Sequence, residues 1–71
     1  MTINERIVEL RKMHSLTQKQ LASAISASER GIQNYETGHR KPTLDIAIAL
    51  ADYFNVSLDY LCGRSDDPRR L

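Results

Sequence analysis

Hydrophobic residues recur along the chain at the three- and four-residue spacing of amphipathic helices. The positions that share a face are Ile3, Ile7 and Leu10, then Leu21 and Ile25, then Ile32 and Tyr35, and then Leu44, Ala47, Leu50, Ala51 and Phe54. Leu58 and Leu61 anchor a short last segment. No stretch of four or more residues alternates in the manner of a strand. The pattern therefore predicts an all-α fold.

Residues that favour helix N-termini mark five starts along the chain. The predicted N-caps are Thr2, Thr17, Ser28, Thr43 and Ser57. Thr2 with Glu5, and Thr17 with Gln20, have the spacing of a capping box, in which each side chain satisfies a backbone donor. Gly38, Asn55 and Gly63 mark helix ends, because these residues tolerate a left-handed backbone. We expect a compact five-helix bundle with short connections.

The length of 71 residues suits a single domain. We place the domain at residues 1–63 and read 64–71, "RSDDPRRL", as a tail or the start of a linker because it lacks apolar spacing. The lone Cys62 excludes an internal disulfide, and no Cys/His spacing indicates a metal or a cofactor. No apolar run is long enough for a membrane span, and "MTINERIVEL" does not resemble a signal peptide, so we expect a cytoplasmic protein.

Only Ser26 and Ala27 separate the second and third predicted helices, which sets the two helices at a steep angle as in a helix-turn-helix. A helical wheel places Gly31, Ile32 and Tyr35 on the inner side of the third helix. The outer side carries Glu29, Arg30, Gln33 and Asn34, with Thr37. These side-chain types read base edges in DNA, but polar residues also cover any solvated helix. The wheel alone leaves both interpretations open.

The segment from Leu16 to Gly63 resembles the Cro and phage-repressor type helix-turn-helix family (the XRE type) of bacterial and phage transcriptional regulators, and the resemblance extends back to Arg11. It rests on "LTQKQLA", on the spacing of Ser28, Ile32, Tyr35, Glu36 and Gly38, on "RKP", and on "VSLDYLCG". It implies the lambda-repressor-like fold and sequence-specific binding of double-stranded DNA by a regulator, most simply a repressor on a two-fold symmetric operator.

The resemblance also implies roles for individual residues. Expected base contacts in the major groove are Glu29, Arg30, Gln33 and Asn34. Expected DNA backbone contacts are Gln18, Lys19, Ser28, Thr37, His39, Arg40 and Lys41. Gln18 is alternatively a plain first-turn residue, and His39 part of a solvated loop. Arg11 and Glu36 match a pair that forms an internal salt bridge, so we expect these two residues to be structural.

Three residues depart from the family pattern. Ser15 and Ser26 occupy turn positions where glycine is frequent, so both turns must form without its freedom. Gly31 occupies a position where a hydroxyl residue is common, and as a glycine inside a helix it costs about 1 kcal/mol relative to alanine. We expect Gly31 at the inward edge of the polar face, where either a close approach to helix two or the DNA backbone would explain it.

Family members usually bind DNA as dimers, so we expect a homodimer. Its contact could include Ile46, Ala49, Tyr53 and Tyr60, although these residues could equally pack inside the monomer. Neither a catalytic arrangement nor a small-molecule site is evident, so an enzyme is not expected. The alternative function is that of a protein-interaction module such as an antitoxin-like partner domain, which the net charge of only +1 slightly favours.

Overall fold

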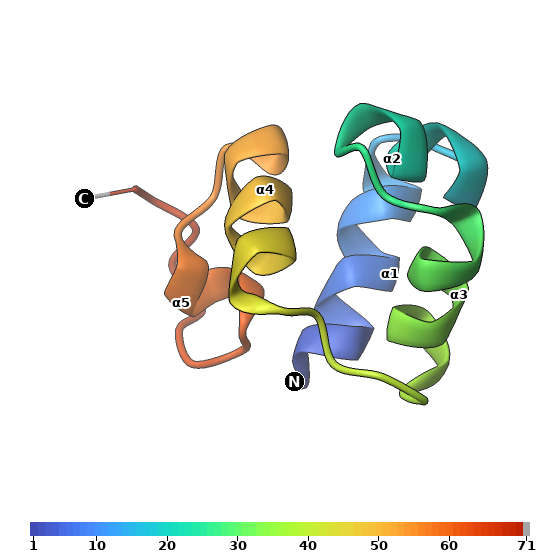
Figure 1. Ribbon diagram of the computed structural model, residues 1–71. Helices are drawn as coiled ribbons and strands as arrows, with labels where there is room; N and C mark the ends of the chain where they lie inside the picture. Colours follow the sequence, from blue (N-terminus) through green and yellow to red (C-terminus); the bar gives the residue numbers. More distant parts are fainter. Residues whose placement is uncertain (71) are drawn as a thin grey trace.

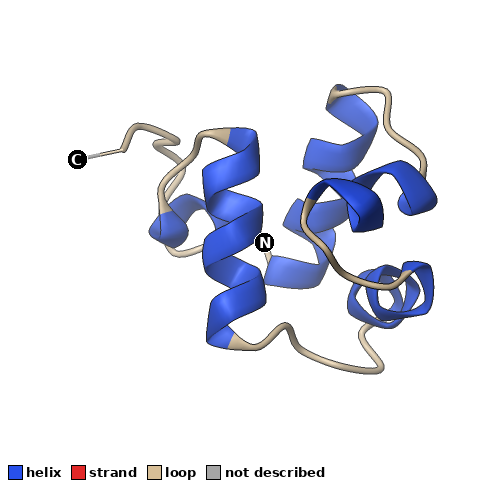
Figure 2. Ribbon diagram, turned by 45° about the horizontal axis from the view of Figure 1, so that its top comes forward, coloured by secondary structure: helices blue, strands red, loops and turns tan. Residues whose placement is uncertain are grey.

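The computed structural model describes residues 1–70, which form five helices and no strand. The helices are α1 (Ile3–Met13), α2 (Gln18–Ala24), α3 (Glu29–Thr37), α4 (Leu44–Phe54) and α5 (Leu58–Leu61). Figure 2 shows short loops between them. The predicted all-α class and the five predicted helices are confirmed.

Each helix begins directly after its predicted N-cap residue. The Thr2 and Thr17 side chains accept from the backbone of Glu5 and Gln20, and each of those side chains accepts from the cap residue in return. Both capping boxes are therefore complete, and helix ends that would otherwise leave donors unpaired are satisfied locally.

Helix α1 lies between two helical pairs, with α2 and α3 on one side and α4 and α5 on the other (Figure 1). It packs against α3 and against α5, while α2 packs against α3 and α4 against α5. The largest fully buried side chains, Ile7, Leu21, Ile32, Leu50 and Leu61, come one from each helix. A single core therefore joins all five helices.

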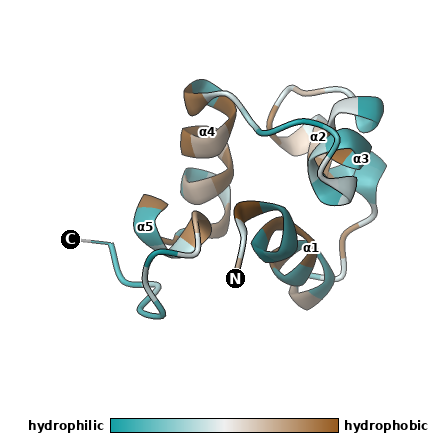
Figure 3. Ribbon diagram, turned by 90° about the horizontal axis from the view of Figure 1, so that it is seen from below, coloured by the Kyte–Doolittle hydropathy of each residue, from teal (hydrophilic) through white to brown (hydrophobic). Residues whose placement is uncertain are grey.

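Two predicted core residues lie outside that core. Leu44 is 66% exposed and Leu58 is 36% exposed, so the expectations that Leu44 lies on the core face of α4 and that Leu58 anchors α5 were wrong. Both are the first residue of their helix, and helical side chains lean toward the N-terminus. Their side chains therefore extend past the end of the core. Figure 3 shows hydrophobic residues along much of α4.

The turns before and after α2 are made without glycine. Ser15 has φ 55° and Ser26 has φ 57°, so both serines hold the left-handed conformation that glycine adopts most readily. Asn55, which ends α4, has φ 55°. Gly63, which follows α5, has φ 78°. The helix-turn-helix geometry thus forms at some backbone strain.

The segment after Gly63 has no helix, but it lies against α4 and α5. The Ser57 N–H donates to the Pro68 carbonyl at 2.9 Å, and Arg70 pairs with Asp52 at 2.5 Å. No helix within residues 1–70 is long and apolar enough to cross a membrane.

Candidate nucleic-acid interface

The outer face of α3 carries the four residues expected to contact bases. Glu29, Arg30 and Gln33 are exposed, while Asn34 is half-buried. On the opposite side Ile32 is fully buried, and Tyr35 packs against the core. The helix is therefore held by Ile32 and Tyr35 and presents a polar face to the outside.

Gly31 is half-buried on α3, between the exposed polar face and the inner side that Tyr35 occupies. With Arg30, Asn34, Tyr35 and Arg40 it lines a surface hollow along the helix. A Cβ at Gly31 would lie 3.0 Å from Ser28 Oγ and 3.9 Å from the Tyr35 ring, with no atom of α2 nearer. Close approach to helix two therefore does not explain this glycine.

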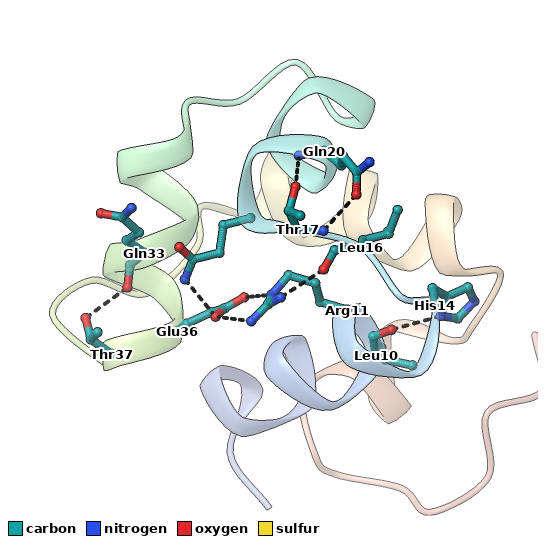
Figure 4. Close-up of polar contacts among 10 residues, drawn as sticks. Leu10, Arg11, His14, Leu16, Thr17, Gln20, Gln33, Glu36 and Thr37 are labelled. Atoms are coloured by element: carbon teal, nitrogen blue, oxygen red, sulfur yellow. Dashed lines mark hydrogen bonds and ion pairs between the residues drawn. The ribbon is translucent and has the colours of Figure 1, made fainter.

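Ser28 and Thr37 use their hydroxyl groups within the protein. Ser28 Oγ accepts from the Gly31 N–H at 3.0 Å and caps α3. Thr37 Oγ1 donates to the Gln33 carbonyl at 2.9 Å (Figure 4). His39 Nδ1 lies 2.7 Å from Thr37 Oγ1. His39 is thereby held beside the last turn of α3.

The loop after α3 continues the hollow with cationic side chains. The Arg40 N–H donates to the Asn34 carbonyl at 3.2 Å, which folds the loop back onto the helix end. Lys19, Arg30, Arg40 and Lys41 are all exposed, and none of them forms an ion pair within residues 1–70. Their charges are therefore not neutralised by a neighbouring carboxylate of the described chain.

Arg11 and Glu36 form a largely buried ion pair that joins α1 to the end of α3 (Figure 4). Arg11 Nε lies 2.6 Å from Glu36 Oε2, and the side chains are 15% and 7% exposed. Arg11 also donates to the Leu16 carbonyl at 2.9 Å. The Arg11 guanidinium thus connects the turn before α2 to the C-terminal end of α3.

Gln18 at the start of α2 joins this network. Its Nε2 donates to Glu36 Oε1 at 3.0 Å, a contact that the sequence did not reveal. The spacing of 18 residues between the two positions carries no helical signal, so only the crossing of α2 and α3 brings them together. Within residues 1–70, the side-chain oxygen and the second N–H of Gln18 make no hydrogen bond, so the amide can still bind another partner.

The residues expected at a dimer contact do not form one exposed surface. Ile46 and Tyr60 pack against the core, Ala49 is half-buried and Tyr53 is 45% exposed. The Arg6 guanidinium carbon lies 3.7 Å from the centre of the Tyr60 ring and covers it. The exposed large apolar residues of α4 and α5 are Leu44, Ile48, Tyr53 and Leu58.

Sequence comparison places the chain among regulators. The chain is 42% identical over 64 residues to the uncharacterized HTH-type transcriptional regulator YobD of Bacillus subtilis, covering 90% of this chain and 57% of that protein. It is 39% identical over 64 residues to the cryptic phage CTXphi transcriptional repressor RstR of Vibrio cholerae, with the same two coverages. The chain thus spans about half the length of the curated relatives it matches.

Structural comparison leads to the same group. The P22 c2 repressor, solved in complex with a synthetic operator, superposes with a TM-score of 0.84 at 26% identity, covering 92% of this chain and 98% of the repressor chain. These proteins are named as regulators or repressors, and none of them as an enzyme. A helix-turn-helix family model matches residues 7–61. The chain therefore belongs to the helix-turn-helix family, of the Cro and phage-repressor type.

Proposed function

We propose that this chain binds double-stranded DNA sequence-specifically and represses transcription from a two-fold symmetric operator. The observation that carries the proposal is the outer surface of α3, where base-reading side chains lie beside cations that have no ion-pair partner within residues 1–70. The structural likeness to a repressor solved with its operator supports the same assignment.

In this proposal α3 enters the major groove with Glu29, Arg30, Gln33 and Asn34 toward the bases. Arginine pairs with guanine through two hydrogen bonds, asparagine or glutamine with adenine, and glutamate accepts from the cytosine amino group. The basic side chains of Lys19, Arg40 and Lys41, with His39, contact phosphates on either side. These phosphate contacts set the orientation and supply most of the affinity.

Gln18 contributes to the same backbone contact in this proposal. Its Nε2 is held by Glu36, so the amide has one fixed orientation before DNA arrives. The backbone N–H groups at the start of α2 favour an anion at the same place. A phosphate there meets a prearranged set of donors, which lowers the entropy lost on binding.

We further propose that two copies bind the operator together. A single recognition helix reads only a few base pairs, whereas two copies related by a two-fold axis read half-sites about one helical turn apart. The exposed apolar residues on α4 and α5, namely Leu44, Ile48, Tyr53 and Leu58, lie on the half of the bundle away from α3 and supply a surface for this contact.

Selection of bound sequences from a random duplex pool tests the proposal. We expect a palindromic consensus, and binding to that consensus should weaken steeply as salt concentration rises because counterions are released from the phosphates. Asn34→Ala should lose about 1 to 3 kcal/mol of binding free energy on the selected site and little on unrelated DNA.

Asp66→Ala is the matched control, because Asp66 is exposed in the segment after α5 and lies outside both the α3 face and the proposed dimer contact. It should leave the consensus and the affinity unchanged. Binding that is undetectable or insensitive to salt would contradict the proposal and favour a protein partner for the α3 face.

A further inference from the structure

Asn4 lies in the first turn of α1 and is not part of the outer face of α3. Its side chain nevertheless contacts two segments of the proposed interface, the end of α3 and the loop that follows it. Its Nδ2 donates to the carbonyl of Tyr35 in the last turn of α3. The same nitrogen lies 3.5 Å from the carbonyl of Arg40 in the loop between α3 and α4. One amide group therefore lies between the end of the recognition helix and the loop.

The carbonyls at the end of α3 need partners because the helix stops at Gly38, which turns the chain with φ 83°. The Asn34 carbonyl accepts from the Arg40 N–H, and the Gln33 carbonyl accepts from the Thr37 hydroxyl. Both of those donors belong to α3 or its own loop. Tyr35 instead receives its donor from α1, so this contact ties the helix end to the body of the domain.

We propose that Asn4 is a positioning residue for DNA binding, which sets the basic loop of His39, Arg40 and Lys41 relative to α3. This inference rests on the proposed function. A side-chain amide nitrogen carries two N–H groups and can serve both carbonyls at once. With the loop backbone fixed at Arg40, the phosphate-binding cations keep a constant distance from the base-reading side chains.

The chemistry requires a donor of this size at this position. Asn4→Asp keeps the shape but turns the donor into a carboxylate oxygen that faces two carbonyl oxygens. Like partial charges then repel, and the two carbonyls lose their partner. Asn4→Ser keeps one short donor and tests the same contact with a smaller perturbation of the fold.

A double-mutant cycle with Arg40→Ala tests the role at a temperature where all variants are folded. Asn4→Asp should lower operator affinity about five- to tenfold, and the slope of log affinity against log salt should fall by about one phosphate contact. In the Arg40→Ala background the same change should cost at least threefold less, because part of what Asn4 positions is already absent. In the Gln33→Ala background it should keep its full cost.

Amide hydrogen exchange without DNA gives an independent readout. The Arg40 N–H is bonded to the Asn34 carbonyl, so in Asn4→Asp and Asn4→Ser it should exchange faster, while the amide of buried Leu50 should not. The positioning role would be overturned if Asn4→Asp lost equal affinity in the wild-type and the Arg40→Ala backgrounds. It would also be overturned if both the salt slope and the exchange of the Arg40 N–H were unchanged. If the wild type bound no DNA, the proposed function would fail, and the exchange experiment would still decide whether Asn4 orders the loop.

Discussion

At the scale of single residues, Ser26 holds a left-handed backbone conformation in the turn that joins α2 to α3. For a residue with a Cβ that conformation costs free energy, whereas glycine adopts it freely but loses more conformational entropy on folding. Since the first effect exceeds the second, Ser26→Gly should raise the free energy of unfolding by about 0.5 to 1 kcal/mol. Urea denaturation measures the change, and a decrease would show that the turn is not strained.

Glu5 makes the stability of α1 depend on pH. Hydrogen bonds from the Thr2 backbone N–H and then the Thr2 hydroxyl lower the pKa of the Glu5 carboxyl in the folded protein. A group whose pKa is lower when folded stabilises the fold above its unfolded pKa, and that contribution is lost as pH falls through the acidic range. We therefore expect Glu5→Gln, which keeps an accepting oxygen, to flatten the dependence of unfolding free energy on pH below the ordinary glutamate pKa.

Urea denaturation of both proteins between neutral and strongly acidic pH measures this effect. The two curves should diverge most at neutral pH and approach each other at the acidic end. If the difference between the two proteins stayed constant over the whole range, the Glu5 contact would not be the cause.

At the scale of elements, the Arg11–Glu36 pair connects α1 with α3. Because both side chains are largely buried, removal of one leaves the other charge without a partner in a poorly solvated site. Glu36→Ala should lower the free energy of unfolding by about 3 kcal/mol, measured by urea denaturation. Arg69→Ala, which breaks an exposed pair with Asp67, is the control and should change stability far less.

The helix boundaries could be predicted because they depend on local chemistry. A side chain such as Thr17 or Ser28 satisfies backbone donors only two or three residues away, so its effect is visible in the sequence. The exposure of Leu44 and Leu58 could not be predicted in the same way, because it depends on where the core ends relative to each helix start. An apolar residue at the first helical position fits the periodic pattern whether or not anything packs against it.

In the candidate site, too, the features that depend on local pattern could be predicted, and the contacts between distant positions could not. The outer face of α3 follows from helical periodicity and the likeness to known regulators, and the charged residues of the next loop are visible as a cluster. The contacts of Gln18 with Glu36 and of Asn4 with Tyr35 join distant positions, and only the packing of helices brings them together. The neighbours of Gly31 also needed the structure, because a helical wheel gives the angle of a residue on its own helix and not what packs beside it.

At the scale of the whole molecule, the exposed apolar side chains of α4 and α5 predict how two copies meet. Leu44 and Ile48 are one helical turn apart on α4, and 66% and 43% of these side chains remain exposed. Leu44→Ser together with Ile48→Ser should shift the protein toward monomer in sedimentation experiments and weaken operator binding, because apolar contact area is lost.

Met13→Ser is the matched control for that prediction. Met13 is 68% exposed, but it lies at the end of α1 and outside the α4–α5 surface. Its replacement should leave the oligomeric state unchanged. If the double variant and the control behaved alike, the α4–α5 surface would not be the dimer contact.

The position of α1 between the two helical pairs has a consequence for operator architecture. In a dimer joined through α4 and α5, each recognition helix is connected to the two-fold axis through the packing of α1 on both pairs. The angle at which α1 packs against α3 and α5 then sets the distance between the two α3 helices of the dimer. A substitution that changes this angle should alter the preferred spacer length between half-sites while leaving the sequence of each half-site unchanged.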